Sequence, residues 1–228
     1  TEEAQKRLIQ LGEEENRIHV IGSPDIDIML SDKLPSLEDS LKWYGIPFQN
    51  YGILMYHPVT TENNTVGQKI KAVVDAALES DRNFIVVYPN NDLGSEVILN
   101  EYKRFEGNPR FRVFPSLRFE FFLTLLKNAE FIVGNSSAGI RESGVYGVPG
   151  IDIGTRQSGR YSTTHIKNLQ HVEEDAKAIV EAIDRTPMHR WTSSTFGSGN
   201  STQQFNAILS DPKFWEIKIQ KRFIDYDI

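Results

Sequence analysis

The chain has 228 residues, a formal net charge of −6 and no cysteine. The negative charge removes the basic footprint that nucleic-acid-binding proteins carry, and the lack of cysteine excludes disulfides, thiolate metal sites and a cysteine nucleophile. No segment approaches the roughly 20 apolar residues that cross a bilayer, so we expect neither a nucleic-acid nor a membrane partner. We expect a cytoplasmic protein. Because the chain starts without Met inside a helical pattern, we also expect a fragment of something longer.

The first fifty residues predict little regular structure. An amphipathic pattern favours a helix over 2–12, and a short apolar run favours a strand over 17–22. The segment 23–50 is irregular and contains three prolines. It holds one predicted helix, at 36–45, because Ser36 and Asp39 have the spacing of a capping box.

From residue 51 strands and helices alternate. Apolar runs predict strands over 51–58, 83–90, 111–115, 130–135, 150–154 and 165–169. Helical periods lie between or after them, over 67–80, 95–107, 118–129 and 172–185. Continuous apolar runs suit strands that are covered on both faces. The pattern therefore predicts an α/β fold, a Rossmann-like parallel sheet with helices on both faces. After residue 186 we expect a loop and one last helix over 211–223.

Polar residues collect where the predicted strands end. The segments are "HPVTTEN" (57–63), "PNNDLGS" (89–95), "PSLRF" (115–119), "NSSAGIRE" (135–142) and "GTRQSGR" (154–160). The carboxyl ends of parallel strands meet at one edge of the sheet, where open α/β sheets bind their ligands. We therefore expect the binding site at this edge.

The segment 135–142 has the composition of a phosphate site. A helix N-terminus there would offer unpaired N–H groups, and Ser136 and Ser137 would add hydroxyl donors. Gly139 would let a ligand approach the backbone. Glu142, five residues after Ser137, would lie about 7.5 Å further along the helix than Ser137. That distance is within reach of ribose hydroxyls. The alternative is a plain Asn/Ser helix cap with a solvated Glu. The four other polar strand ends favour a nucleotide.

Together these segments resemble the hydrolysing UDP-N-acetylglucosamine 2-epimerases. "RIHVIGSPDID" (17–27) belongs to the resemblance, and "GNSS.G.RE" followed by "GTRQ.GR" is its most specific part. The resemblance implies a GT-B-like architecture, with two Rossmann-like domains facing across a cleft. It implies that this chain holds the C-terminal half. The expected division is a remnant of the N-terminal domain (1–28), a linker (29–45), a UDP-binding domain (46–195) and a crossing-helix region (196–228).

The resemblance implies roles for five residues around the diphosphate. His57 would lie near the diphosphate and the sugar and be required for activity. Ser136 and Ser137 would bind the diphosphate. Arg156 would lie at the diphosphate–sugar end, and Arg160 would be a second cation.

Further contacts are implied for the nucleoside. Asn90 would contact the nucleotide, Ser116 and Leu117 would lie beside the base, and Glu142 would bind the ribose. Without the resemblance, His57 would be interpreted as the end of a strand, Asn90 as a turn residue and the two arginines as loop charges. The remaining histidines, which show no metal-ligand spacing, are His19, His165, His171 and His189.

The implied reaction converts UDP-GlcNAc to UDP and N-acetylmannosamine for sialic-acid biosynthesis. A base removes the C2 proton while UDP leaves C1, and water then adds with inverted configuration at C2. No metal or other cofactor is implied. The acid and base at C2 would belong to the N-terminal domain, and the full-length enzyme would be a homodimer or tetramer. Three alternatives stay open: a GT-B glycosyltransferase that uses a UDP-sugar, a UDP-diacetamido-sugar 2-epimerase, and a UDP-binding module without catalysis.

Overall fold

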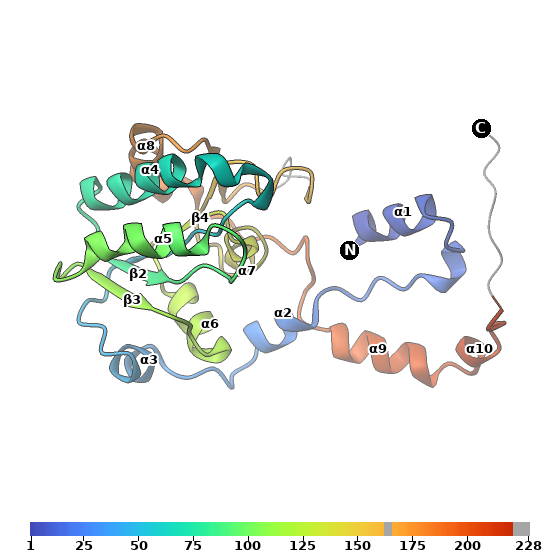
Figure 1. Cartoon of the computed structure of the whole chain (residues 1–228). Coiled ribbons are helices and arrows are strands. Elements are labelled where there is room, and N and C mark those ends of the chain that lie inside the picture. The colour runs from blue at the N-terminus through green and yellow to red at the C-terminus, as the bar shows by residue number, and fades with distance from the viewer. Residues whose placement is uncertain (162–165, 221–228) are drawn as a thin grey trace. The chain divides into compact units, whose positions relative to one another are not determined.

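The computed structural model describes residues 1–161 and 166–220. These residues belong to two compact units (Figure 1). The larger unit is Leu34–Ser193, and the smaller one combines Thr1–Lys33 with the segment that starts at Ser194.

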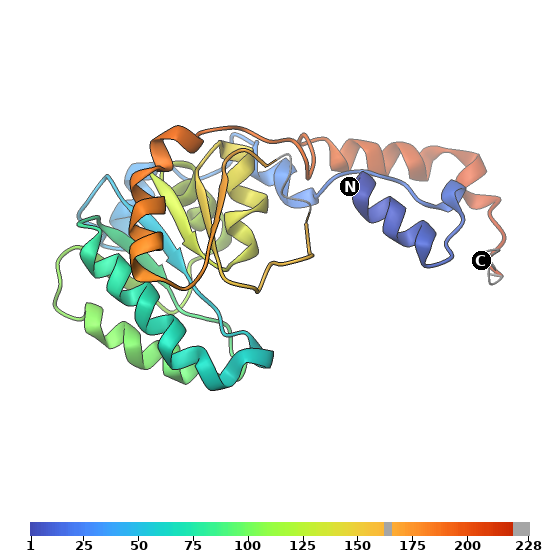
Figure 2. The ribbon, with the colours of Figure 1, turned by 90° about the horizontal axis from the view of Figure 1, so that it is seen from above.

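The larger unit is built on a parallel sheet in the order β3-β2-β1-β4-β5-β6 (Figure 2). Its strands are β1 (Gly52–Met55), β2 (Phe84–Val87), β3 (Phe111–Phe114), β4 (Phe131–Gly134), β5 (Gly150–Ile153) and β6 (Leu169–Val172). β1 lies in the middle, where Gly52 is in register with Phe84 on one side and Phe131 on the other. The predicted doubly wound α/β fold is confirmed.

Helices cover both faces of this sheet (Figures 1 and 2). One face carries α4 (Val66–Glu79), α5 (Ser95–Tyr102) and α8 (Ala176–Asp184), and the other carries α3 (Leu37–Trp43), α6 (Phe119–Lys127) and α7 (Arg141–Tyr146). The short 3₁₀ turns of this unit are η2 (Thr60–Thr65), η3 (Lys103–Phe105), η4 (Ser137–Gly139) and η5 (Thr186–His189). Ser36 caps α3 as predicted, since its Oγ accepts from Asp39 N at 3.0 Å, whereas the Asp39 carboxylate accepts from Ser36 Oγ.

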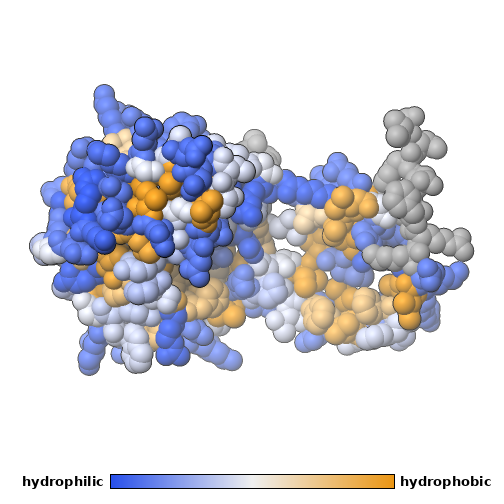
Figure 3. Space-filling model, in the orientation of Figure 1, coloured by the Kyte–Doolittle hydropathy of each residue, from blue (hydrophilic) through white to orange (hydrophobic). Residues whose placement is uncertain are grey.

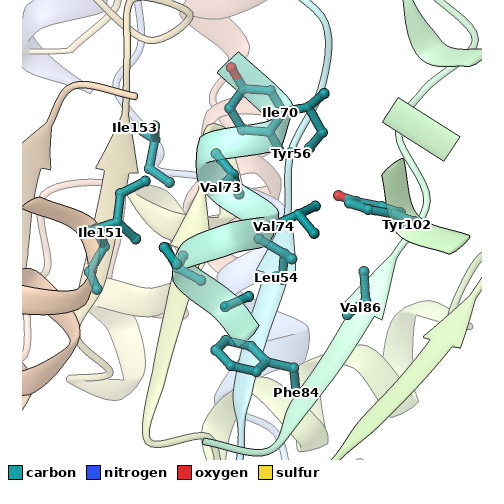
Figure 4. Close-up of a cluster of buried hydrophobic side chains, with 14 of the residues drawn as sticks. Leu54, Tyr56, Ile70, Val73, Val74, Phe84, Val86, Tyr102, Ile151 and Ile153 are labelled. Atoms are coloured by element: carbon teal, nitrogen blue, oxygen red, sulfur yellow. The ribbon is translucent and has the colours of Figure 1, made fainter. Parts of the chain in front are cut away.

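Alternate residues of β1 to β4 enter two separate cores. On one face Leu54 and Val86 pack against Val74 of α4 (Figure 4). On the other, Ile53 and Ile132 pack with helix α6. Each fully buried aliphatic side chain contributes about 1.5–3 kcal/mol. Packing on both faces therefore fixes the strands firmly, and the loops at their carboxyl ends start from a rigid edge.

The smaller unit consists of short helices: α1 (Glu2–Gln10), η1 (Glu15–Arg17), α2 (Pro24–Met29), α9 (Ser201–Ser210) and α10 (Pro212–Trp215). Asp27 joins its two chain segments, because its carboxylate accepts from both Ser201 N and Ser201 Oγ and from Thr202 N. The hydrogen bonds, from Ser201 first, hold the pKa of Asp27 below its usual range.

Four predictions for the smaller unit were wrong. Residues 18–22 form no strand, because no described strand lies beside them to complete a ladder. Helix α2 lies in the segment expected to be irregular, and α9 lies in the expected loop. The last helix is α10, four residues long rather than 211–223; Ile219, whose apolar side chain supported the longer helix, is 99% exposed. Positions 221–223 lie outside the described residues.

In the larger unit the main differences concern the sixth strand and the helix after β4. β6 starts at Leu169, where the predicted strand ended; His165, at the start of that prediction, lies outside the described residues. The domain boundaries inferred from the resemblance stay a prediction. Among the described residues, no helix is both long and apolar enough to span a membrane.

Candidate functional site

A buried amide joins the ends of β1 and β4. Asn135, which directly follows β4, is 1% exposed. Its Oδ1 accepts from His57 N at 2.7 Å, and its Nδ2 donates to His57 O at 2.8 Å. A buried polar side chain needs such partners to offset the loss of water. Asn135 therefore fixes the backbone of His57 beside the end of β4.

The same residue anchors the loop after β5. The backbone O of Asn135 accepts from Arg156 Nη1 at 3.1 Å and from Gln157 Nε2 at 2.7 Å. These contacts bring Arg156 into the network that holds His57. Sequence reasoning named His57 and Arg156 but assigned no role to Asn135 or Gln157. Both amide side chains are buried in the fold, and this burial, which the sequence alone does not show, is what reveals their role.

The guanidinium of Arg156 is held with part of its charge uncompensated. Burial, followed by repulsion from nearby Arg160, lowers the pKa of Arg156 from its usual range, although Asp92 partly opposes this effect. Arginine remains protonated in proteins. Two cations held close together in a partly buried loop favour an anion with several acceptor oxygens.

His57 is set up as a neutral hydrogen-bond donor. Its Nδ1 accepts from Asn90 N at 3.1 Å, which requires the neutral ring to carry its proton on Nε2. Burial first, and then the charge of Arg156, lower the pKa of His57 to about 4, with Asp92 opposing them. At neutral pH the uncharged ring therefore offers an Nε2–H group.

Asn90 holds His57 through its backbone. Its side-chain Nδ2 donates to Asp92 Oδ2. Its Oδ1 is buried and has no hydrogen-bond partner among the described residues. The side chain can therefore accept a further hydrogen bond, and the backbone contact with His57 is a function that the sequence did not predict.

The segment after β4 is not the continuous helix that the sequence favoured. Ser136 Oγ accepts from Ala138 N at 3.4 Å and starts the short turn η4. Helix α7 starts only at Arg141, so Glu142 lies in its first turn and not on one helix with Ser137. The turn packs closely against β5, because a Cβ at Gly150 would lie 2.1 Å from Gly139 O. At Gly139 itself a Cβ would make an ordinary contact with the buried Ile132, whose Cγ2 lies 3.9 Å away, so glycine is not required there by packing.

The end of β3 is separate from this network. Ser116 is exposed and Leu117 is half-buried against the core beneath α6. Among the described residues, no hydrogen bond joins either of them to Asn135 or His57. The structure thus joins His57 to Asn90 by a direct hydrogen bond and brings Arg156 to them through Asn135. Arg160 is linked through its 3.4 Å hydrogen bond to Gln157.

Comparison with known proteins identifies the family. Residues 1–210 match the family model described as UDP-N-acetylglucosamine 2-epimerase. The chain belongs to this family. It is 46% identical, over its whole length, to UDP-N-acetylglucosamine 2-epimerase of Neisseria meningitidis serogroup B, of which it covers 60%. It is 30% identical to the polysialic acid biosynthesis protein P7 of Escherichia coli over 99% of this chain and 58% of that protein.

The fold agrees with solved structures of the family. The UDP-GlcNAc 2-epimerase of Methanocaldococcus jannaschii, in complex with UDP-GlcNAc and UDP, matches with a TM-score of 0.74 at 23% identity, over 92% of this chain and 59% of that one. The enzyme of Neisseria meningitidis bound to UDP-GlcNAc matches with a TM-score of 0.70 at 15% identity, over 92% and 59% of the two chains. The chain thus spans about 60% of the length of the relatives it matches.

Proposed function

We propose that this chain supplies the UDP-binding side of a hydrolysing UDP-GlcNAc 2-epimerase, which converts UDP-GlcNAc to UDP and N-acetylmannosamine for sialic-acid biosynthesis. The observation that carries the proposal is the network in which Asn135 holds His57 and Arg156 together at the carboxyl edge of the sheet. The names of the meningococcal and Escherichia coli relatives support the substrate and the pathway.

The reaction places specific demands on this edge. The C2 proton is removed while the C1–O bond breaks, so negative charge accumulates on the departing diphosphate, and water then adds to the glycal. Arg156 and Arg160 bind that diphosphate and stabilise the developing charge. His57 donates its Nε2–H to the same group. The acid and base at C2, which the resemblance places in an N-terminal domain, are not among the residues assigned here.

The remaining contacts of the proposal concern the rest of the nucleotide. Ser136 and Ser137 bind the diphosphate, which approaches the backbone at Gly139, and Glu142 binds the ribose. Asn90 accepts a hydrogen bond through its buried Oδ1. Ser116 and Leu117 lie beside the base.

Replacement of Arg156 tests the proposed UDP site directly. Arg156→Ala should weaken UDP binding roughly ten- to a hundredfold, because a charge-assisted hydrogen bond contributes about 1.5–3 kcal/mol. Isothermal titration calorimetry measures the change. Arg82→Ala is the matched control, because Arg82 makes only a 3.6 Å surface ion pair with Asp184. Equal affinity of the Arg156 and Arg82 variants would mean that UDP does not bind at this edge.

Product analysis separates the alternatives. The complete enzyme, incubated with UDP-GlcNAc and no acceptor, should release UDP and free N-acetylmannosamine. A non-hydrolysing epimerase would form UDP-N-acetylmannosamine, and a glycosyltransferase or a binding module would leave the sugar nucleotide largely intact. Turnover of a UDP-diacetamido sugar in preference to UDP-GlcNAc would identify the diacetamido-sugar epimerase.

A further inference from the structure

A second polar cluster lies beneath the loop that carries Arg156. Lys69 of α4 donates from Nζ to Glu62 Oε2 at 2.6 Å and to Glu174 Oε1 at 3.0 Å. Glu62 belongs to η2, and Glu174 follows β6. The Glu174 side chain is 7% exposed, so its charge is largely withdrawn from water. The Lys69 ammonium group thus donates hydrogen bonds to two carboxylates that lie at different strand ends.

The cluster forms hydrogen bonds with the residues that directly precede His57 and Arg156. Tyr56, directly before His57, donates its hydroxyl to Glu174 Oε1 at 3.0 Å. Thr155, directly before Arg156, donates its hydroxyl to Glu62 Oε1 at 2.5 Å. Each carboxylate therefore binds Lys69 together with one neighbour of the proposed diphosphate site.

The backbone after β5 is shaped to fit this cluster. Gly154 has φ +69°, and a Cβ at that position would lie 2.2 Å from Glu174 Oε1. Only glycine brings the strand end this close to a buried carboxylate without strain. Hydrogen bonds from Lys69, and then from Thr155, lower the pKa of Glu62, so Glu62 accepts as an anion at neutral pH and the bond from Thr155 is charge-assisted.

We propose that Glu62, itself held by Lys69, is a positioning residue that orients Arg156 through Thr155. This inference rests on the proposed UDP site. The loop that starts at Thr155 is then fixed at two points: the Thr155 hydroxyl on Glu62, and the Arg156 and Gln157 side chains on Asn135 O. Loss of the first point leaves the guanidinium able to bind but no longer held toward the diphosphate.

Two substitutions test the hydrogen bond between Thr155 and Glu62 separately from the other contacts of the loop. Thr155→Val removes the hydroxyl and keeps the shape, and Glu62→Gln removes the charge of the acceptor. Each should weaken UDP binding about tenfold, the size of one charge-assisted hydrogen bond, while binding of uridine, which has no phosphate, stays unchanged. The double variant should be no weaker than the stronger single variant, because both remove the same interaction. Thr155→Ser keeps the hydroxyl and should restore UDP affinity.

Controls distinguish positioning from folding and from the UDP site itself. Asp75→Asn is matched to Glu62→Gln, because Asp75 also accepts from two cations, Lys71 and Arg104, but belongs to an outer cluster. It should leave UDP affinity unchanged. The proposal is overturned if Thr155→Val and Glu62→Gln weaken UDP and uridine equally, or if they change the urea midpoint and not the affinity for UDP. If Arg156→Ala binds UDP like the unaltered chain, the UDP site is refuted first, and the positioning role is refuted with it.

Discussion

At the scale of single residues, the site depends on side chains that never need to touch a ligand. His57 and Arg156 could be named from their motifs because a cation and an imidazole at a strand end have recognisable chemistry. Asn135 could not, because an Asn at a strand end is equally a helix cap, and only burial shows that it binds the backbone of His57. Long-range contacts of this kind leave no local signal in a sequence.

Asn135→Ala should cost about 2–6 kcal/mol of unfolding free energy. The substitution removes the hydrogen-bond partner of both the N–H and the C=O group of His57. Each buried polar group without a partner costs about 1–3 kcal/mol. Urea denaturation measures the loss. Asn91→Ala, at an exposed position of the next loop, should stay within about 0.5 kcal/mol of the original chain. A similarly small effect for Asn135→Ala would show that the amide is not a structural link.

His57 should remain neutral, with its proton on Nε2, from pH 7 down to about pH 5. Its folded pKa of about 4 lies below the unfolded value of about 6.5. Protons therefore bind preferentially to the unfolded chain, and the contribution of His57 to stability is present above pH 6.5 and is lost as the pH falls toward 4. Nitrogen-15 NMR of the imidazole reports both tautomer and titration. A midpoint near 6.5, or a proton on Nδ1, would contradict the geometry.

At the scale of elements, the helices and strands of the larger unit agree closely with those predicted from the sequence, and those of the smaller unit do not. Apolar runs between helical periods predict buried parallel strands because both faces of each strand are covered, and β1 to β5 lie within the predicted ranges. Helix α9, whose N-cap residue is Asn200, was missed because the carboxylate that accepts from its first N–H groups belongs to Asp27, 174 residues before Ser201 in the chain. The interruption between η4 and α7 was also missed, and the turn there packs closely against Gly150 of β5, a contact that the local sequence does not show. Both contacts are tertiary.

Asp27→Ala should loosen α9 in a pH-dependent way. Loss of a side-chain acceptor at a helix N-terminus costs about 0.5–2 kcal/mol, and the backbone N–H groups of Ser201 and Thr202 lose their acceptor. Because the pKa of Asp27 is lowered on folding, the stabilisation is present above the ordinary carboxyl range near pH 4 and is lost as the pH falls through the lowered value.

Hydrogen exchange of the α9 amides at pH 7 measures this loosening. Asp32→Ala, a carboxylate in the loop after α2, is the control and should leave α9 exchange unchanged. Equal protection of α9 in the Asp27 and Asp32 variants would refute the long-range contact.

At the scale of the whole molecule, the surface of the smaller unit carries many apolar side chains. Figure 3 shows them in orange among the residues of that unit. Leu11 and Trp215 are among the exposed examples. Such patches are typical of surfaces that contact another protein segment. This surface suits the predicted remnant and crossing-helix regions of a two-domain enzyme, whose boundaries remain predictions.

We therefore expect this chain alone to bind UDP but to release no N-acetylmannosamine from UDP-GlcNAc. Reaction needs groups held on both sides of the sugar at near-attack geometry, and the residues proposed here supply one side. The assay measures free N-acetylmannosamine with the chain alone and after addition of a separately expressed N-terminal domain of the family. Turnover by the chain alone at the rate of an intact enzyme would disprove this division of roles.

The strand order has a consequence for the time course of folding. His57 and Asn90, on the β1 and β2 side, are 33 residues apart in the chain, whereas His57 and Asn135, across the β1–β4 pairing, are 78 apart. Closing the longer loop costs about 0.8 kcal/mol more chain entropy, and non-local pairing forms slowly. We expect β1 to β3 to gain protection before β4 docks, so that the proposed diphosphate site is completed in the final step. Pulse-labelling of backbone amides during refolding measures this order, and simultaneous protection of β2 and β4 would contradict it.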